Sequence, residues 1–209
     1  MDTIYLCNEY DKNEFLDLII DKDTNIIIFN QQIKKVNMQV LDNVTVNINE
    51  FNNLTLDDRV ITITIKKNAT INYNLSSIIE SSHALNIKIN YEGNESKVNA
   101  NIHSIVKGTE TINITGTIKN ESKNNTLLER VKVMLLEDGK CEVNPDIEIK
   151  TNAVNANHLV AISNIRDNEL FYLMSKGISI SLANDLIKRS FLIGNIKDEE
   201  LKLKINEYL

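Results

Sequence analysis

The stretch of sequence that decides the fold class is RVITITIKKNATINYNL, residues 59–75. In its first half isoleucine alternates with threonine, so Ile61, Ile63 and Ile65 fall on one side of an extended chain. Such alternation is typical of a β-strand with one buried and one polar face. The cluster KKN interrupts the pattern before it resumes, which indicates two short strands joined by a turn.

Similar alternating runs recur from Asn25 to about His158, with Asn, Asp, Gly and Lys clusters between them. They include residues 85–91, 112–118 and 154–156, and no stretch of this region has helical periodicity. The pattern predicts an all-β fold of many short strands. It does not separate an antiparallel β-sandwich from a parallel β-helix, although the hairpin-like run quoted above favours the sandwich.

The pattern changes after Ile165. Asp167 is a good N-cap for a first helix, Gly177 stands where that helix would stop, and Ser179 can cap a second helix. We therefore expect a β-rich domain over residues 1–165 and a helical domain over residues 166–209.

The rest of residues 166–209 contains two further segments whose apolar residues recur at helical spacing. In the second helix we expect Leu182, Leu186 and Phe191 on or near one side. The third helix, within residues 197–209, has its apolar residues at intervals of four: Leu201, Ile205 and Leu209. Helices this short are marginal alone, so they must pack on the β-rich part or on a partner.

Charge and cysteine usage narrow the class of protein. A net charge of −6 and a pI near 5.2 argue against nucleic acid as a partner. No apolar run is long enough to span a bilayer, and the first twenty residues lack the basic start of a signal peptide. Cys7 and Cys141 lie far apart, as free thiols in a reducing compartment would. We expect a cytoplasmic protein without a membrane partner, and we interpret its many asparagines as compositional bias.

Familiar catalytic motifs are missing from the sequence. It contains no G-x-S-x-G, no H-E-x-x-H and no G-x-x-x-x-G-K-[ST]. The acids within residues 137–148 have no His or Arg among them and are expected to be solvated. A polysaccharide-degrading β-helix enzyme usually needs secretion and an acidic cleft, so we expect no enzyme activity.

Residues 145–192 read PDIEIKTNAVNANHLVAISNIRDNELFYLMSKGISISLANDLIKRSFL. This segment resembles the C-terminal signature of the SufB/SufD family, the scaffold subunits of the SUF iron–sulfur cluster assembly machinery. The matching features are Pro145 with its acid-centred strand, the strand ending at His158, and the sequence LFYL at residues 170–173. Ser-Lys-Gly-Ile at residues 175–178 is similar to the family's Ser-Arg-Gly-Ile.

The resemblance implies a right-handed parallel β-helix with a small C-terminal α-helical domain, which replaces the sandwich preference. It implies pairing through the β-helix with a SufB/SufD-like partner or with a second copy. It also implies binding of an ABC-type ATPase, SufC-like, through the C-terminal helices. The apolar residues expected at that docking site are Leu170, Phe171, Tyr172, Leu173 and Met174.

Two residues are candidates for holding iron or sulfur. Cys141 stands near the place where the cluster-building branch of the family has a cysteine, and His158 coincides with the family's shared histidine. Thiolate and imidazole are competent iron ligands, so we expect both residues to act together at the pairing interface on a transient iron–sulfur cluster that is not tightly bound. The alternatives are a small buried thiol and a packed core histidine. His83 and His103 match no motif, and His103 is expected to be solvent-exposed.

The segment departs from the family after His158. The family continues with Gly-Ala or Glu-Ala, whereas this chain has Leu159, so the acid of one branch is missing. A family-derived structural or interaction protein that has lost cluster chemistry is therefore the alternative function.

Overall fold

The computed structural model describes residues 1–6, 14–54, 58–118, 123–151 and 153–209. Within these ranges the chain forms β-strands followed by three helices. The strands are β1 (Asp2–Leu6), β2 (Phe15–Ile20), β3 (Thr24–Phe29), β4 (Lys35–Val40), β5 (Thr45–Leu54), β6 (Asp58–Ile65), β7 (Thr70–Ile79), β8 (Ser82–Tyr91), β9 (Lys97–Val106), β10 (Thr109–Ile118), β11 (Asn125–Leu135), β12 (Lys140–Ile149) and β13 (Val154–Asn164). Cys7 lies outside the described residues.

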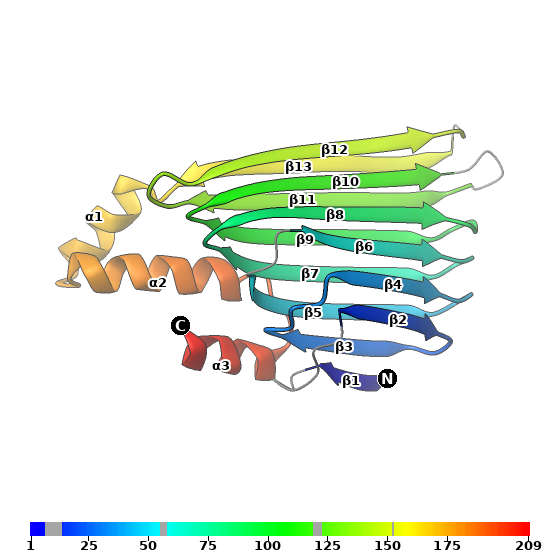
Figure 1. Cartoon of the computed structure of the whole chain (residues 1–209), viewed down its shortest axis with the longest axis horizontal. Coiled ribbons are helices and arrows are strands. Elements are labelled where there is room, and N and C mark those ends of the chain that lie inside the picture. Colours follow the sequence, from blue (N-terminus) through cyan, green and yellow to red (C-terminus); the bar gives the residue numbers. More distant parts are fainter. Residues whose placement is uncertain (7–13, 55–57, 119–122, 152) are drawn as a thin grey trace.

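Successive strands alternate between two parallel sheets. Sheet A has the order β1-β3-β5-β7-β9-β11-β13, and sheet B has the order β12-β10-β8-β6-β4-β2. Each strand pairs in parallel with the strand two positions away in sequence, as β8 does with β10, and not with its sequence neighbour. In Figure 1 the nearer strands run to the right and the farther strands to the left as the chain rises, which is a right-handed coil. The parallel β-helix is confirmed, and the sandwich expectation is wrong.

The core consists of apolar columns, because equivalent positions stack from one turn of the solenoid to the next. Ile61 and Ile63 are buried and stand in register with Ile87 and Ile89 of the next turn. Burying each such side chain contributes about 1.5–3 kcal/mol. Gly116 continues the second column, and a Cβ there would overlap the side chain of Leu127 from the opposite sheet.

Asparagine has two structural uses in this solenoid. The amides of Asn47, Asn72 and Asn99 each donate to the Asn one turn earlier, at 3.1, 2.9 and 2.8 Å. Such ladders stabilise stacked parallel strands. Other asparagines, Asn30, Asn43, Asn68 and Asn124, have positive φ, a conformation that Asn tolerates better than most residues. The asparagine content is therefore more than compositional bias.

The helices are α1 (Asp167–Ser175), α2 (Ile180–Ile193) and α3 (Glu199–Tyr208). The Ser179 side chain caps α2, as the sequence predicts, by accepting from the Leu182 backbone N–H. The cap of α1 is Arg166, one residue before the predicted Asp167, so that Asp167 lies in the acidic first turn. No helix among the described residues is long and apolar enough to cross a membrane.

The second and third helices cover the outer face of sheet A. Four residues of this tail, Leu192, Ile196, Leu201 and Ile205, form a second core with Ile27, Phe51, Ile105 and Met134 of the sheet. The side of α2 that packs inward includes Ala183 and Ile187, whereas Leu182 and Leu186 are exposed. The last strand ends at Asn164 and α1 begins at Asp167, and the division into two domains there stays a prediction.

Candidate functional site

The solenoid ends at β12 and β13, and we call the inward-facing residues of these two strands the open end. In the part of the chain that the structure describes, each of these strands pairs on one side only. Val160 and Ile162 continue the buried columns of Val131 and Val133, yet they are 44% and 42% exposed. Ile149 of β12 is similarly exposed. The open end is therefore a layer of inward-facing residues that no described part of the chain covers.

Cys141 is the second residue of β12 and packs against the edge of the core. It is the register partner of Glu110, which in turn is the register partner of His83, and both of these residues are buried. Burial, together with the nearby carboxylates of Glu110 and Glu142, raises the pKa of the Cys141 thiol to about 12. In the isolated chain the group is thus a thiol at neutral pH, whereas a metal ligand must be a thiolate.

Glu110 is a buried carboxyl group whose register partners are His83 and Cys141. The Ser104 hydroxyl donates to its Oε1 over 3.2 Å, and a second serine, Ser77, lies 2.8 Å from Ser104. Its Oε2 has no hydrogen-bond partner among the described residues. Burial raises the pKa of Glu110 to about 7, against the effect of the Ser104 hydrogen bond.

His158 faces into the solenoid from β13 and contacts Glu129, its register partner on β11. The distance from His158 Nδ1 to Glu129 Oε2 is 2.6 Å. The Glu129 side chain is 1% exposed and that of His158 is 32% exposed. Burial raises the pKa of Glu129, while the hydrogen bond from His158 acts in the opposite direction.

Sequence reasoning missed Glu129, although a signal was present. In the run LLERVKV it has the same parity as Leu127 and Val131, so an acid occupies an inward-facing core position. An acid at such a position needs a partner, which His158 supplies. The structure therefore places a carboxylate beside His158 even though Leu159 follows it.

The structure does not bring Cys141 and His158 together in one chain. Cys141 is the register partner of Glu110, and Glu110 contacts Ser104. Ser104 is in register with Val133, which is in register with Ile162 of β13. Cys141 therefore lies near the level of Ile162 along the strands. His158 is four residues away from Ile162 along β13, which corresponds to roughly 13 Å at 3.3 Å per residue. Among the described residues there is also no group of three His, Cys, Asp or Glu that could hold a metal ion.

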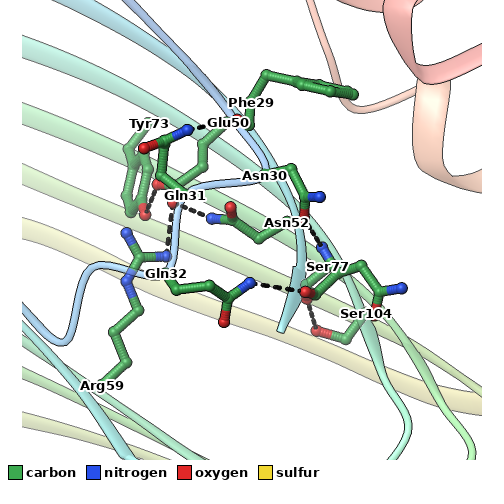
Figure 2. Close-up of polar contacts among 11 residues, drawn as sticks. Phe29, Asn30, Gln31, Gln32, Glu50, Asn52, Arg59, Tyr73, Ser77 and Ser104 are labelled. Atoms are coloured by element: carbon green, nitrogen blue, oxygen red, sulfur yellow. Dashed lines mark hydrogen bonds and ion pairs between the residues drawn. The ribbon is translucent and has the colours of Figure 1, made fainter. Parts of the chain in front are cut away.

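A separate polar cluster lies deeper inside the solenoid (Figure 2). Arg59 on β6 reaches across to Glu50 on β5, with 2.6 Å between Nη1 and Oε1, and both side chains are buried. Tyr73 donates to Glu50 Oε2 over 2.6 Å, and Asn52 donates to Oε1. Because the charges neutralise each other and both side chains are buried between strands of the two sheets, we interpret this cluster as a cross-link between the sheets.

The tail carries an exposed apolar surface. Helix α1 buries none of its residues, and Phe171 and Tyr172 are 69% and 64% exposed. With Met174 of α1 and Leu182 and Leu186 of α2, which are also exposed, they form what we call the α1 surface. A groove of about 720 Å³ lies between the two helices, lined by residues that include Tyr172, Leu173, Leu186 and Phe191. Leu170 and Leu173 are only half-buried.

His103 is not solvent-exposed, contrary to the sequence expectation. Its ring stacks on Phe191 with 4.8 Å between centroids, and its Nδ1 lies 2.8 Å from the Phe191 carbonyl oxygen. Burial lowers the pKa of His103. The outer face of sheet A carries polar residues beside the apolar ones that contact the helices, and His103 is a polar residue of this face that packs against Phe191 of α2.

Part of this chain is similar to known proteins. Residues 125–191 match the family model described as SUF system FeS cluster assembly, SufBD core domain. They run from β11 to the end of α2 and contain both the open end and most of the α1 surface. A SufBD family protein of iron–sulfur cluster assembly from Pyrococcus horikoshii is 31% identical over 96 residues, which are 46% of this chain and 22% of that relative. This chain thus spans under a quarter of the relative's length. The resemblance is confirmed over this segment: residues 125–191 match the SufBD core domain, and 96 residues of the chain are similar to a protein of the SufBD family.

Proposed function

We propose that this protein is a scaffold subunit of SUF-type iron–sulfur cluster assembly. The observation that carries the proposal is the SufBD core match over residues 125–191, because those residues build the open end and α1. The chemistry of ATP hydrolysis then belongs to a partner, an ABC-type SufC-like ATPase. The iron–sulfur cluster is a transient cargo and not a resident cofactor.

The pairing surface in this proposal is the open end. Its exposed core residues and the free edges of β12 and β13 would be covered if a SufB/SufD-like chain, or a second copy, met them. Unpaired strand edges next to exposed apolar side chains are a common site of association. Ile149, Val160 and Ile162 are the exposed apolar residues of the open end that such a partner would bury.

The ATPase would dock on the α1 surface. Apolar helix faces commonly bind in grooves of a partner, and Phe171 and Tyr172 are aromatic anchors of the kind that dominate such interfaces. Helices α2 and α3 cannot be removed to test this, because their apolar residues are buried against sheet A. Point substitutions on α1 are therefore the appropriate probe.

Cys141 and His158 are the proposed donors to iron or sulfur at the open end. Roughly 13 Å separates their levels along the strands, so a cluster bound to either residue would need further ligands from the partner chain. The high pKa of Cys141 in the single chain means that its proton must leave when a metal binds. This feature also gives weight to the alternative, a family protein that pairs and binds the ATPase but builds no cluster.

Anaerobic reconstitution with iron and sulfide, in the presence and absence of the cognate ATPase, separates these two functions. The scaffold function predicts a visible chromophore with bound iron and acid-labile sulfide, reduced in Cys141→Ser and His158→Ala. If wild type gains no chromophore under either condition, the interaction-protein function holds. If both variants gain as much as wild type, neither residue is a ligand.

A further inference from the structure

We propose that Glu129 is a positioning residue: its buried carboxylate holds Nδ1 of His158, so that Nε2 alone is presented at the open end as a donor to Fe²⁺. This inference rests on the proposed function and deepens it, since it names the atom through which the chain would meet iron. It assigns a role to a buried acid that has no counterpart in the sequence motif.

Among the described residues, Glu129 makes no hydrogen bond or ion pair other than the one with His158. Its side chain is almost completely buried in a column that contains Tyr73 and Ala100 below it and His158 above it. Its Oε2 contacts His158 at 2.6 Å, and its Oε1 has no hydrogen-bond partner among the described residues. Leaving a carboxylate oxygen buried without a donor costs free energy, which an apolar residue in that column would avoid.

The imidazole is held on one side only. Nδ1 is bound to Glu129, no hydrogen bond to Nε2 occurs within the described ranges, and about a third of the side chain is exposed. Because β13 is the last strand of sheet A in the described residues, no described strand lies above the inward-facing ring. The ring is thus fixed from below and accessible at the open end.

This arrangement favours one tautomer. A carboxylate can only accept a hydrogen bond, so Nδ1 carries the proton and the lone pair of a neutral ring is on Nε2. Histidines that bind metals commonly donate their other N–H to a carboxylate, which orients the ring and makes the metal-binding nitrogen more basic. Removing that partner typically weakens metal binding by roughly 10–100-fold.

The test compares Glu129→Gln with Glu129→Leu in the full chain. The Gln side chain can still accept from Nδ1, whereas Leu cannot, and either should fit among the apolar neighbours. Two readouts are needed: the tautomer of His158 from long-range ¹H–¹⁵N NMR, and the affinity for Fe²⁺ from anaerobic calorimetry. Glu148→Leu, which removes an exposed acid from β12 farther along the strand from Cys141, is the matched control.

The expected result is an Nδ1–H tautomer in wild type and Glu129→Gln, and its loss in Glu129→Leu together with a 10–100-fold weaker affinity for Fe²⁺. An Nε2–H tautomer in wild type, the absence of Fe²⁺ binding, or equal affinity in Glu129→Leu would overturn the proposal. The two proposals fail separately. A chain that binds Fe²⁺ through His158 but builds no cluster refutes only the scaffold function, and a cluster that forms equally well in Glu129→Leu refutes only the role of Glu129.

Discussion

Glu110 on β10 and Cys141 on β12 are register partners, and both side chains face into the solenoid at the level where the core becomes open. The carboxylate of Glu110 makes ionisation of the Cys141 thiol more difficult, because two negative charges would then share a poorly solvated site. At neutral pH the thiol of Cys141 is protonated, and the carboxyl group of Glu110 titrates near that pH.

The raised pKa of Glu110 predicts a stability that falls with increasing pH. Below about pH 4.5 the folded and unfolded states both hold the proton; between about 4.5 and about 7 only the folded state holds it. The stabilisation that Glu110 contributes is therefore fully present at low pH and is lost as the pH rises through about 7. The free energy of unfolding should fall by about 3 kcal/mol, because each pKa unit corresponds to about 1.4 kcal/mol. Urea unfolding at pH 5 and pH 8 measures it.

The difference between wild type and Glu110→Gln isolates this group from others, since His103, with a lowered pKa, has the opposite sign. In Glu110→Gln the free energy of unfolding should no longer fall between pH 5 and pH 8. In Asp146→Asn, which changes an exposed residue of β12, it should fall as in wild type. Equal pH dependence in wild type and Glu110→Gln would show that Glu110 is not the titrating group.

The ion pair between Glu50 and Arg59 predicts strong non-additivity. Arg59→Met leaves the Glu50 carboxylate buried without its partner and should cost about 3–5 kcal/mol in the free energy of unfolding. The double variant Glu50→Gln/Arg59→Met removes both charges and should recover most of that loss. Denaturant unfolding of the single and double variants checks this, and additive losses would contradict the cross-link interpretation.

Substitutions on α1 should separate binding from folding. Phe171→Ser and Tyr172→Ser remove exposed side chains, so the free energy of unfolding should change by no more than about 0.5 kcal/mol. Their affinity for the SufC-like ATPase should fall by a factor of about ten or more, as expected for aromatic anchors. Leu203→Ser, at an exposed position of α3, is the control and should bind like wild type. Unchanged affinity in both α1 variants would remove α1 from the interface.

The open end should be sensitive to charge. Ile162→Asp places a carboxylate at a position already 42% exposed, so the single chain should remain folded. A partner that covers this layer would bury the charge without a counter-ion, and pairing should weaken strongly. Circular dichroism verifies the fold and light scattering follows the pairing. A variant that pairs as tightly as wild type would place the interface elsewhere.

The sequence predicts some of these features far better than others, for physical reasons. Alternation around Ile61 and Ile63 predicts the strands and their buried faces, because side-chain direction is a local property. Parallel stacking depends on partners about 25 residues away, as in the Asn47–Asn72 contact, and only the segment from Pro145 onward indicated it. His103 was misjudged because parity tells which face a residue occupies and not whether a helix covers that face.

The residues of the candidate site could be recognised from the sequence, but their positions relative to one another could not. Cys141 and His158 were recognisable by residue type, but their separation depends on strand register. Glu129 could have been recognised as an acid at a core position, whereas its contact with His158 requires knowledge that β11 and β13 are neighbours.

The central claim is that this chain is a scaffold that pairs and binds an ATPase. Sedimentation velocity of the full chain at micromolar concentration, alone and with a SufC-like ATPase, tests it most directly. The scaffold account predicts at least a dimer of the chain or its pairing with a SufB/SufD-like partner, and a heavier species when the ATPase is added. A monodisperse monomer that pairs neither with a second copy nor with a SufB/SufD-like partner, and that does not bind the ATPase, would contradict it.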